Sequence, residues 1–337
     1  MTKVLLTGGS GFIAAHILEL LLQRGHEVVT TVRSEDKASK IRSAHPDAKL
    51  SVVIVPDIAQ PDAFDEVVKT PGLEVVLHTA SPFHYKWSDP KTELLDPAIV
   101  GTTSILKAIK KSAPGVKRVV ITSSFASILS DAKLADPKTV FSEKDWNPST
   151  YEDGLGDHKP TSYRVSKTLA EKSAWEFVEK EKPNFDLATV CPPLVFGPVV
   201  HHLNSLAAIN TSNERFVDLI RGKWQAGIPE TGVFFWVDVR DVALAHVEAF
   251  ERPAAGGKRF FVLAGKFNNR EVAAAVRANF PDLKDKLPTE DVQGGDYPAG
   301  GVYGYDSSRA TEELGIKWTS IEKSSVDTVK SLLDVGA

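Results

Sequence analysis

The fold is decided by the stretch Lys3-Val4-Leu5-Leu6-Thr7-Gly8-Gly9-Ser10-Gly11-Phe12-Ile13-Ala14, which joins an apolar run to a glycine-rich turn. The apolar run predicts a strand buried on both faces, a helix is expected to follow to about residue 24, and residues 27–33 predict a second strand. A strand, glycine-rich turn, helix and strand in this order hold the pyrophosphate of a dinucleotide at the helix N-terminus. Gly8 allows the tight turn, and Gly11 lets the backbone approach the phosphates.

The composition is that of an ordinary globular protein: of 337 residues, 42% are hydrophobic and 25% are charged. The net charge of -4 offers no basic surface of the kind that binds nucleic acid or anionic membranes. The single cysteine, Cys191, excludes an intrachain disulfide and a cysteine-based metal cluster, and it fits a reducing compartment. His201 and His202 are favoured as loop residues over metal ligands, since no HExxH spacing occurs. We therefore expect a cytoplasmic protein without signal peptide, membrane span, metal or nucleic-acid partner.

Strands and helices continue to alternate beyond the first unit. Apolar runs at residues 50–55, 74–82, 117–125 and 185–191 predict further strands with helices between them. The alternation predicts an α/β fold, a doubly wound parallel sheet of the Rossmann type, over residues 1–198. Residues 130–160 show little periodicity and indicate a loop over the site. Residues 199–337 lose the parallel rhythm and indicate a smaller substrate-binding α/β domain, some of whose elements are allowed to return to the first domain.

The end of the second predicted strand selects the dinucleotide. An acidic residue there binds a ribose 2'-hydroxyl, whereas an arginine suits a 2'-phosphate. The residue is Arg33, and Lys37 follows one turn into the next expected helix. The sequence therefore favours NADPH over NADH. Asp57, after the third strand, is within reach of an adenine amino group, but a plain turn residue is an equally good interpretation.

A tyrosine and a lysine four residues apart form the second motif. The stretch Thr161-Ser162-Tyr163-Arg164-Val165-Ser166-Lys167 begins an expected helix that Thr161 or Ser162 caps and that runs to about residue 178. On one helix face, Tyr163 and Lys167 lie about one turn apart. A phenol has a pKa of ~10 in water, and a nearby cation favours its ionised form, so such a pair can exchange a proton near neutral pH. The alternative is a solvated helix surface, where this spacing is common.

Hydroxyl side chains end the fifth predicted strand, as Thr122-Ser123-Ser124. This is the edge where ligands bind in open α/β sheets. A serine pair at a strand end is usually a turn, but its position on the cofactor edge favours a functional role. The pattern alone does not choose between the two serines.

Taken together, these motifs resemble the extended short-chain dehydrogenase/reductases. Within that family the chain is similar to the dihydroflavonol reductase and cinnamoyl-CoA reductase branch, and in that branch to the fungal NADPH-dependent methylglyoxal and isovaleraldehyde reductases. The similarity runs over essentially the full chain. Its further motifs are Val55-Pro56-Asp57-Ile58, Leu77-His78-Thr79-Ala80-Ser81-Pro82-Phe83, Trp146-Asn147-Pro148, Val195-Phe196-Gly197-Pro198 and Asp238-Val239-Arg240-Asp241-Val242-Ala243.

The resemblance implies an NADPH-dependent carbonyl reductase. A small-molecule aldehyde or ketone, such as methylglyoxal, isovaleraldehyde, a keto ester or an aryl ketone, would receive a hydride from NADPH, which becomes NADP+. The resemblance assigns Ser124 rather than Ser123 as the catalytic serine, which donates a hydrogen bond to the carbonyl oxygen. Tyr163 is the general acid, and Lys167 holds the nicotinamide ribose and supports the phenol. The expected assembly is a monomer or a homodimer.

The same resemblance implies the remaining site residues. The cofactor-binding residues are Gly8, Gly9, Ser10, Gly11, Phe12, Ile13, Arg33, Lys37, Asp57, Ile58, Thr79, Ala80, Ser81, Tyr163, Lys167, Pro192, Val195 and Ser212. The candidate walls of the substrate pocket, each with ordinary packing as the alternative, are Phe83, Leu129, Thr161 and Leu194. The family often has asparagine where Cys191 stands, and Pro193 and Leu194 occupy variable positions, which puts the substrate size in doubt.

The sequence leaves two other functions open. A nucleotide-sugar epimerase or dehydratase of the same superfamily would usually prefer NAD, and Arg33 argues against it. A noncatalytic NADP-binding regulator would often lack the tyrosine or the lysine, whereas this chain has Ser124, Tyr163 and Lys167. Oxidation of NADPH by a panel of carbonyl compounds separates these alternatives.

Overall fold

A parallel sheet forms the centre of the molecule in a computed structural model that describes residues 1–46, 48–81, 87–200 and 209–337. Within these ranges the sheet has seven strands in the order β10-β7-β5-β4-β1-β2-β3. All neighbours pair in parallel. The strands are β1 (Lys3–Thr7), β2 (Glu27–Val32), β3 (Leu50–Ile54), β4 (Leu73–His78), β5 (Arg118–Thr122), β7 (Asp186–Cys191) and β10 (Lys258–Phe261). The predicted Rossmann-type doubly wound sheet is confirmed.

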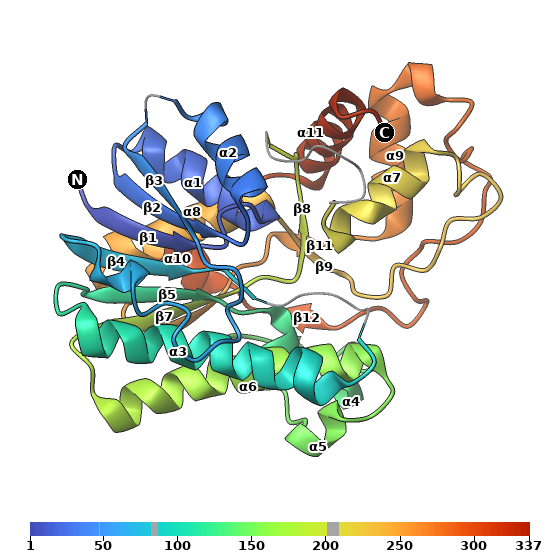
Figure 1. Cartoon of the computed structure of the whole chain (residues 1–337). Helices are drawn as coiled ribbons and strands as arrows, with labels where there is room; N and C mark the ends of the chain where they lie inside the picture. Colours follow the sequence, from blue (N-terminus) through green and yellow to red (C-terminus); the bar gives the residue numbers. More distant parts are fainter. Residues whose placement is uncertain (47, 82–86, 201–208) are drawn as a thin grey trace.

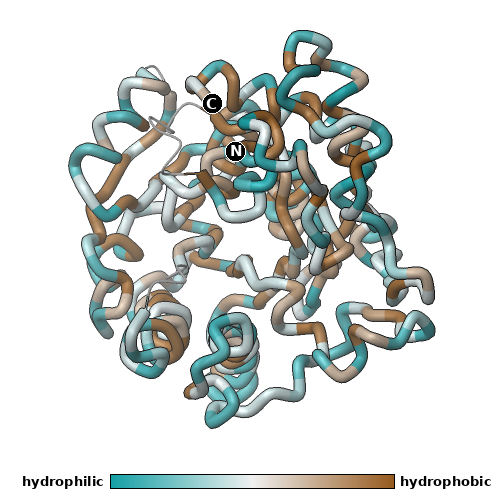
Figure 2. The backbone as a smooth tube through the Cα atoms, turned by 90° about the vertical axis from the view of Figure 1, so that its right-hand side faces the viewer, coloured by the Kyte–Doolittle hydropathy of each residue, from teal (hydrophilic) through white to brown (hydrophobic). Residues whose placement is uncertain are grey.

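Helices cover both faces of the sheet, which explains why its strands are continuously apolar. Val4, Leu5 and Leu6 of β1 have no exposed surface. On one face lie α1 (Phe12–Gln23), α2 (Glu35–Ala44), α8 (Val239–Glu251) and α10 (Ser308–Leu314). On the other face α3 (Asp96–Ser112) and α6 (Lys159–Glu181) lie side by side (Figure 1). Many hydrophilic stretches of the chain lie at the periphery (Figure 2).

A smaller sheet lies beyond the carboxyl edge of the large one (Figure 1). Its strands are β8 (Leu194–Phe196), β9 (Phe235–Asp238) and β11 (Gly265–Lys266), in the order β11-β9-β8. The helices beside it are α7 (Glu214–Ile220), α9 (Asn269–Asn279) and α11 (Ile321–Asp334). Phe196 packs edge-to-face on Phe216 and Phe267, with ring centroids 5.3 and 4.9 Å apart. This aromatic core fixes the smaller sheet and its helices as one unit.

The part of the chain after residue 199 does not stay apart from the first sheet. Strand β10 extends the large sheet by pairing in parallel with β7. Helix α8 packs on α1, where Arg24 forms ion pairs with Glu248 and Glu251. The parallel pattern therefore continues beyond the point where the sequence indicated its end, through contacts between segments that lie far apart in the sequence. His201 and His202 lie outside the described residues.

Two expectations about residues 130–178 are wrong in detail. The expected loop contains α4 (Asp131–Leu134), α5 (Tyr151–Gly154) and β6 (Val140–Phe141), which pairs with the distant β12 (Gly304–Tyr305). Helix α6 begins at Lys159 with His158 at its N-cap position, so neither Thr161 nor Ser162 caps it. Pro160 stands inside the first turn, where its missing N–H breaks no helical hydrogen bond.

No helix in the described ranges is both long enough and apolar enough to cross a lipid bilayer. Helix α6 is long enough at 23 residues, but it carries charged side chains along its length.

Candidate active site

The turn after β1 is built by close backbone contacts. Gly8 has a φ of +75°, and a side chain there would begin 3.1 Å from the Ala80 Cα atom. Gly11 donates its N–H to the Gly8 carbonyl at 2.8 Å and precedes the first residue of α1. No acidic residue occupies the first turn of α1, and no side chain caps it. The N-terminal N–H groups of this 12-residue helix therefore offer an anion-binding site.

A cavity of about 320 Å³ lies at the carboxyl edge of the large sheet. The start of α1, the ends of β4 and β5, helix α6 and the segments on both sides of β8 all contribute to it. Its lining residues include Gly8, Gly11, Phe12, Ile13, Thr79, Ser81, Ser123, Ser124, Tyr163, Lys167, Pro192, Pro193, Val195, Asn210, Thr211 and Ser212. The three predicted catalytic residues therefore meet around one cavity.

The two serines after β5 differ in what their hydroxyls contact. Ser123 is buried, and its Oγ donates to Glu171 Oε2 at 2.5 Å. Ser124 Oγ accepts the N–H of Ala126 at 3.1 Å. That contact leaves the Ser124 hydroxyl proton available to an acceptor in the cavity. The geometry therefore favours Ser124 over Ser123 as a donor to a bound oxygen.

Tyr163 and Lys167 face the cavity from successive turns of α6. Lys167 Nζ donates to Ser81 Oγ at 2.8 Å. Burial lowers the pKa of Lys167 to about 8. Among the described residues the ammonium has no carboxylate partner, so it can be shared with hydroxyl groups of a ligand in the cavity.

A buried histidine supports the loop between β4 and the cavity. Thr7 Oγ1 accepts the N–H groups of Thr79 and Ala80 at 3.2 and 3.1 Å, so its own proton is donated to His78 Nδ1, 2.9 Å away. Burial lowers the pKa of His78 to about 3, and the charge of Lys167 acts in the same direction. The imidazole is therefore neutral, and it positions the backbone that packs against Gly8.

A second cavity of about 470 Å³ adjoins the first and shares Gly8, Gly11, Thr79 and Ser81 with it. Arg33 and Lys37 line it, and neither forms an ion pair with any described residue. Burial and then the charge of Arg33 lower the pKa of Lys37. Two adjacent cations without a carboxylate partner form a site for an anion.

Asp57 lines the second cavity and also stabilises a turn. Its carboxylate accepts the N–H of Ala59 at 2.9 Å and the side-chain amide of Gln60 at 2.7 Å. The hydrogen bonds from Gln60 and then Ala59 lower the pKa of Asp57. Both interpretations of Asp57 from the sequence are therefore compatible with its position.

All but one of the predicted cofactor residues line one of the two cavities. The exception is Gly9, which donates its N–H to Thr31 O at 2.9 Å and packs on β2. A side chain there would begin only 2.1 Å from Thr30 Oγ1. The close packing of the turn on β2 therefore requires a glycine at this position, and the cofactor contact of Gly9 stays a prediction.

The predicted walls of the substrate pocket are Phe83, Leu129, Thr161 and Leu194. Phe83 lies outside the described residues. Leu129 is buried in an aromatic cluster with Phe125 and Phe141, and Leu194 packs against the core of the smaller sheet. The hydroxyl of Thr161 lies 2.8 Å from His158 Nδ1 at the start of α6. None of these three lines either cavity as the described residues form it, because each side chain is engaged in packing or in the helix end.

Asn210 and Thr211 line the first cavity but were not predicted. Asn210 Nδ2 donates to Val195 O at 3.1 Å, and Asn213 Nδ2 donates to Gly197 O at 2.9 Å. These two amides hold the open edge of β8. The Asn210 Oδ1 atom is buried, with no hydrogen-bond partner among the described residues. Its only sequence signal was its position two residues before Ser212.

With this geometry established, comparisons with known proteins identify the family. A family model described as the NAD dependent epimerase/dehydratase family matches residues 4–264, which is well over half of the chain. The chain belongs to this family. The matched region contains all the residues that line the two cavities, including the glycine turn, Ser124, Tyr163 and Lys167.

Full-length relatives in this epimerase/dehydratase family include named reductases. The ketoreductase azaE of Aspergillus niger is 46% identical over 337 residues, covering 98% of both chains. The NADPH-dependent methylglyoxal reductase GRE2 of Saccharomyces cerevisiae is 37% identical, again covering 98% of both. The crystal structure of yeast methylglyoxal/isovaleraldehyde reductase Gre2 complexed with NADPH has a TM-score of 0.89 at 36% identity, covering 99% of this chain and 98% of that one. The resemblance noted from the sequence is confirmed.

Proposed function

We propose that this chain is an NADPH-dependent carbonyl reductase that converts aldehydes or ketones into alcohols. One observation carries the proposal: Ser124, Tyr163 and Lys167 line a single cavity that continues into a second one, lined by two cations that form no ion pair with the part of the chain that the structure describes. The names of its relatives, a ketoreductase and NADPH-dependent methylglyoxal reductases, support the same reaction class.

The residues present fit NADPH. The uncapped N-terminus of α1 suits the pyrophosphate, and Arg33 with Lys37 suits the 2'-phosphate. Asn210 Oδ1, which is buried and has no hydrogen-bond partner within the described ranges, can accept a hydrogen bond from the carboxamide of a nicotinamide. Gly8 and Gly11 let the turn fold tightly, because added side chains would begin within about 3.2 Å of neighbouring backbone atoms.

The chain's own residues would act on the carbonyl oxygen. NADPH, when bound, supplies the hydride. Ser124 donates its hydroxyl proton in a hydrogen bond to the oxygen, where negative charge develops. Tyr163 holds a proton at its phenol oxygen and gives it to the same atom as general acid. The ammonium of Lys167, on the same face of α6, stabilises the charge left on the phenol oxygen.

The charge of Lys167 predicts a pH dependence of NADPH binding. Because its pKa is lowered to about 8, the ammonium that would hold the nicotinamide ribose is lost as the pH rises through that value. In a Tyr163→Phe background, where no phenol titrates, the Kd for NADPH should rise severalfold between about pH 7 and about pH 9.5. Fluorescence titration of the reduced nicotinamide measures this Kd.

Tyr163→Phe/Lys167→Arg is the control for that titration, because a guanidinium stays charged throughout this range. Its Kd for NADPH should change little with pH. An equal alkaline rise in both variants would contradict the role of Lys167.

The reaction class is tested by mixing NADPH with a panel of α-keto aldehydes, branched aldehydes, β-keto esters and aryl ketones and following the loss of reduced-nicotinamide absorbance. We expect oxidation of NADPH with several of these compounds. Oxidation of NADH alone would contradict the role given to Arg33. No oxidation with any carbonyl would overturn the proposal and favour an epimerase, a dehydratase or a noncatalytic NADP-binding regulator.

The remaining assignments are part of the proposal. Residues 1–198 are proposed to carry the cofactor and the catalytic residues, with the smaller sheet and helices α7, α9 and α11 shaping the substrate side. Ser212, from this second part, lines the cavity and supports that division. A cytoplasmic location and a monomeric or homodimeric state stay predictions.

A further inference from the structure

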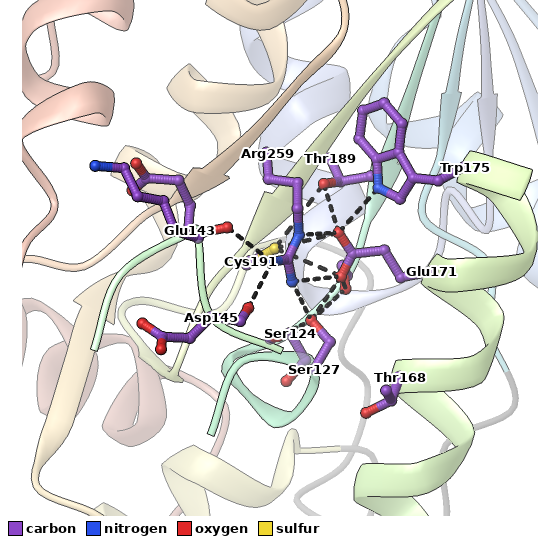
Figure 3. Close-up of polar contacts among 12 residues, drawn as sticks. Ser124, Ser127, Glu143, Asp145, Thr168, Glu171, Trp175, Thr189, Cys191 and Arg259 are labelled. Carbon is purple, nitrogen blue, oxygen red and sulfur yellow. Dashed lines mark hydrogen bonds and ion pairs between the residues drawn. The ribbon is translucent and has the colours of Figure 1, made fainter. Parts of the chain in front are cut away.

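A buried ion pair lies directly behind the Ser124 turn (Figure 3). Glu171 comes from α6 and Arg259 from β10, and only 1% and 9% of their side chains are exposed. Arg259 Nε donates to Glu171 Oε1 at 2.7 Å, and Nη2 donates to Oε2 at 3.2 Å. Burial by itself raises the pKa of Glu171, but the charge of Arg259 and several hydrogen bonds bring it below its ordinary value. The pair is therefore ionised, and it links α6 to the strand that returns from the C-terminal part.

Every donor of Arg259 is used inside the protein. Besides the two bonds to Glu171, Nη2 donates to Ser127 Oγ at 3.2 Å. Nη1 donates to the carbonyls of Glu143 and Asp145 at 2.7 and 2.6 Å. A guanidinium has five N–H donors, so none is left for a ligand. The guanidinium therefore binds no ligand, and the ion pair acts on the protein groups that are hydrogen-bonded to Glu171.

Glu171 holds the residues on both sides of Ser124. Its Oε2 atom accepts from Ser123 Oγ at 2.5 Å and lies 2.6 Å from Ser127 Oγ. Ser127 Oγ also lies 2.8 Å from the carbonyl of Ser124, so its single proton is shared between two acceptors, the carboxylate and the Ser124 backbone. The other carboxylate oxygen, Oε1, accepts from Thr189 Oγ1 of β7 at 2.7 Å. One carboxylate thus anchors the short turn in which Ser124 stands.

Glu171 stands four residues after Lys167, which stands four residues after Tyr163, so all three project from one face of α6. We propose that Glu171 is a positioning residue, which fixes the Ser124 turn at a set distance from the helix face that carries Tyr163 and Lys167. Arg259 supports it by fixing the carboxylate. The role in turnover rests on the carbonyl reduction proposed above, since Ser124 and Tyr163 must reach the same oxygen.

The test must loosen the link without leaving a buried charge unpaired. Removing Glu171 or Arg259 alone would leave the charge of the other residue buried and unpaired, which would destabilise the fold. Ser127→Ala instead removes the hydroxyl that joins Glu171 to the Ser124 backbone. Thr189→Val is the matched control, because it removes another buried hydroxyl from the same carboxylate, but one that comes from β7 and has no hydrogen bond to the Ser124 backbone among the contacts of the described residues.

We expect Ser127→Ala to lower kcat about tenfold while the KM for NADPH changes by less than about twofold, because a small misplacement of a catalytic group slows the reaction without weakening cofactor binding. Thr189→Val should leave both constants near those of the parent protein. A merely structural role would lower thermal stability in both variants and leave kcat alike in the two. Equal kcat values for Ser127→Ala and Thr189→Val would therefore overturn the proposal.

Crystal structures of the two variants keep this inference separate from the proposed function. If the parent protein reduces no carbonyl compound, the proposed function fails, and the position of Ser124 then decides the inference. A displacement of the Ser124 turn relative to α6 in Ser127→Ala but not in Thr189→Val would support it. An unmoved turn in both structures would overturn it.

Discussion

Tyr163→Phe should lower kcat for carbonyl reduction by about a hundredfold to ten-thousandfold, the range that general acid catalysis usually contributes. The substitution removes one oxygen atom at the cavity and keeps the ring that packs beside Val165 and Leu169. The Kd for NADPH should change little, because the uncapped start of α1 and the cations Arg33 and Lys37 are untouched. Steady-state rates and fluorescence titration of NADPH measure the two quantities separately.

Tyr151→Phe is the matched control for this experiment. Tyr151 lies on α5, outside both cavities as the described residues form them, and its hydroxyl donates to Asp96 Oδ1 of α3 at 2.7 Å. Tyr151→Phe loses a phenol oxygen, as Tyr163→Phe does, but at a position outside the cavities. The kcat of this control should therefore stay near that of the parent protein. Undiminished turnover in Tyr163→Phe would remove Tyr163 as the acid. A comparable loss in Tyr151→Phe would mean that the effect is structural.

The nucleotide-binding half of the fold could be predicted because its signals are local. The apolar residues of β1, the glycines after it and the stop of α1 at Gly25 lie within one short stretch. Parallel strands then bring their carboxyl ends to one edge, so Arg33 and Ser124 had to lie at the same edge once the strand order was of the Rossmann type. The candidate site was predictable for the same reason.

The sequence allowed later elements to return to the large sheet, but which of them do so could not be predicted. Lys258–Phe261 would suit a strand of either sheet, and its pairing with β7 depends on where α8 packs. That packing is fixed by contacts such as the ion pair of Arg24 with Glu248 at 2.8 Å, which no local pattern encodes. Leu129 and Leu194 stay predicted substrate-pocket residues, because an apolar side chain suits both a cavity wall and a core and the sequence does not distinguish the two.

The burial of Glu171 could not be predicted from the sequence either. In the sequence it stands beside Lys172 on a helix rich in charge, where a solvated surface is the simplest interpretation. Its partner Arg259 is 88 residues away, and the serines it anchors precede it by more than forty. Only the packing of α6 against β7 and β10 turns this glutamate into a buried anchor.

Arg33→Ala should lower kcat/KM for NADPH about tenfold and leave kcat/KM for NADH nearly unchanged, because NADH has no 2'-phosphate for the guanidinium to bind. Arg33 is exposed, so solvent and salt screen its charge, and we expect the effect to shrink as the ionic strength rises. Arg33→Ala/Lys37→Ala should lower kcat/KM for NADPH further, toward about a hundredfold. Initial rates with both cofactors at low and high salt measure these ratios.

Lys40→Ala separates binding of the 2'-phosphate from a general loss of positive charge. Lys40 lies on α2 with Lys37, but its ammonium is paired with Asp36 at 2.7 Å and does not line the second cavity as the described residues form it. Its loss changes the net charge as much as the loss of Arg33, so any shared fall in rate reports long-range attraction alone. An equal fall for NADPH and NADH in Arg33→Ala would contradict a 2'-phosphate site. A fall for NADPH alone, absent in Lys40→Ala, assigns the preference to the guanidinium, because Lys40→Ala loses the same charge away from the second cavity.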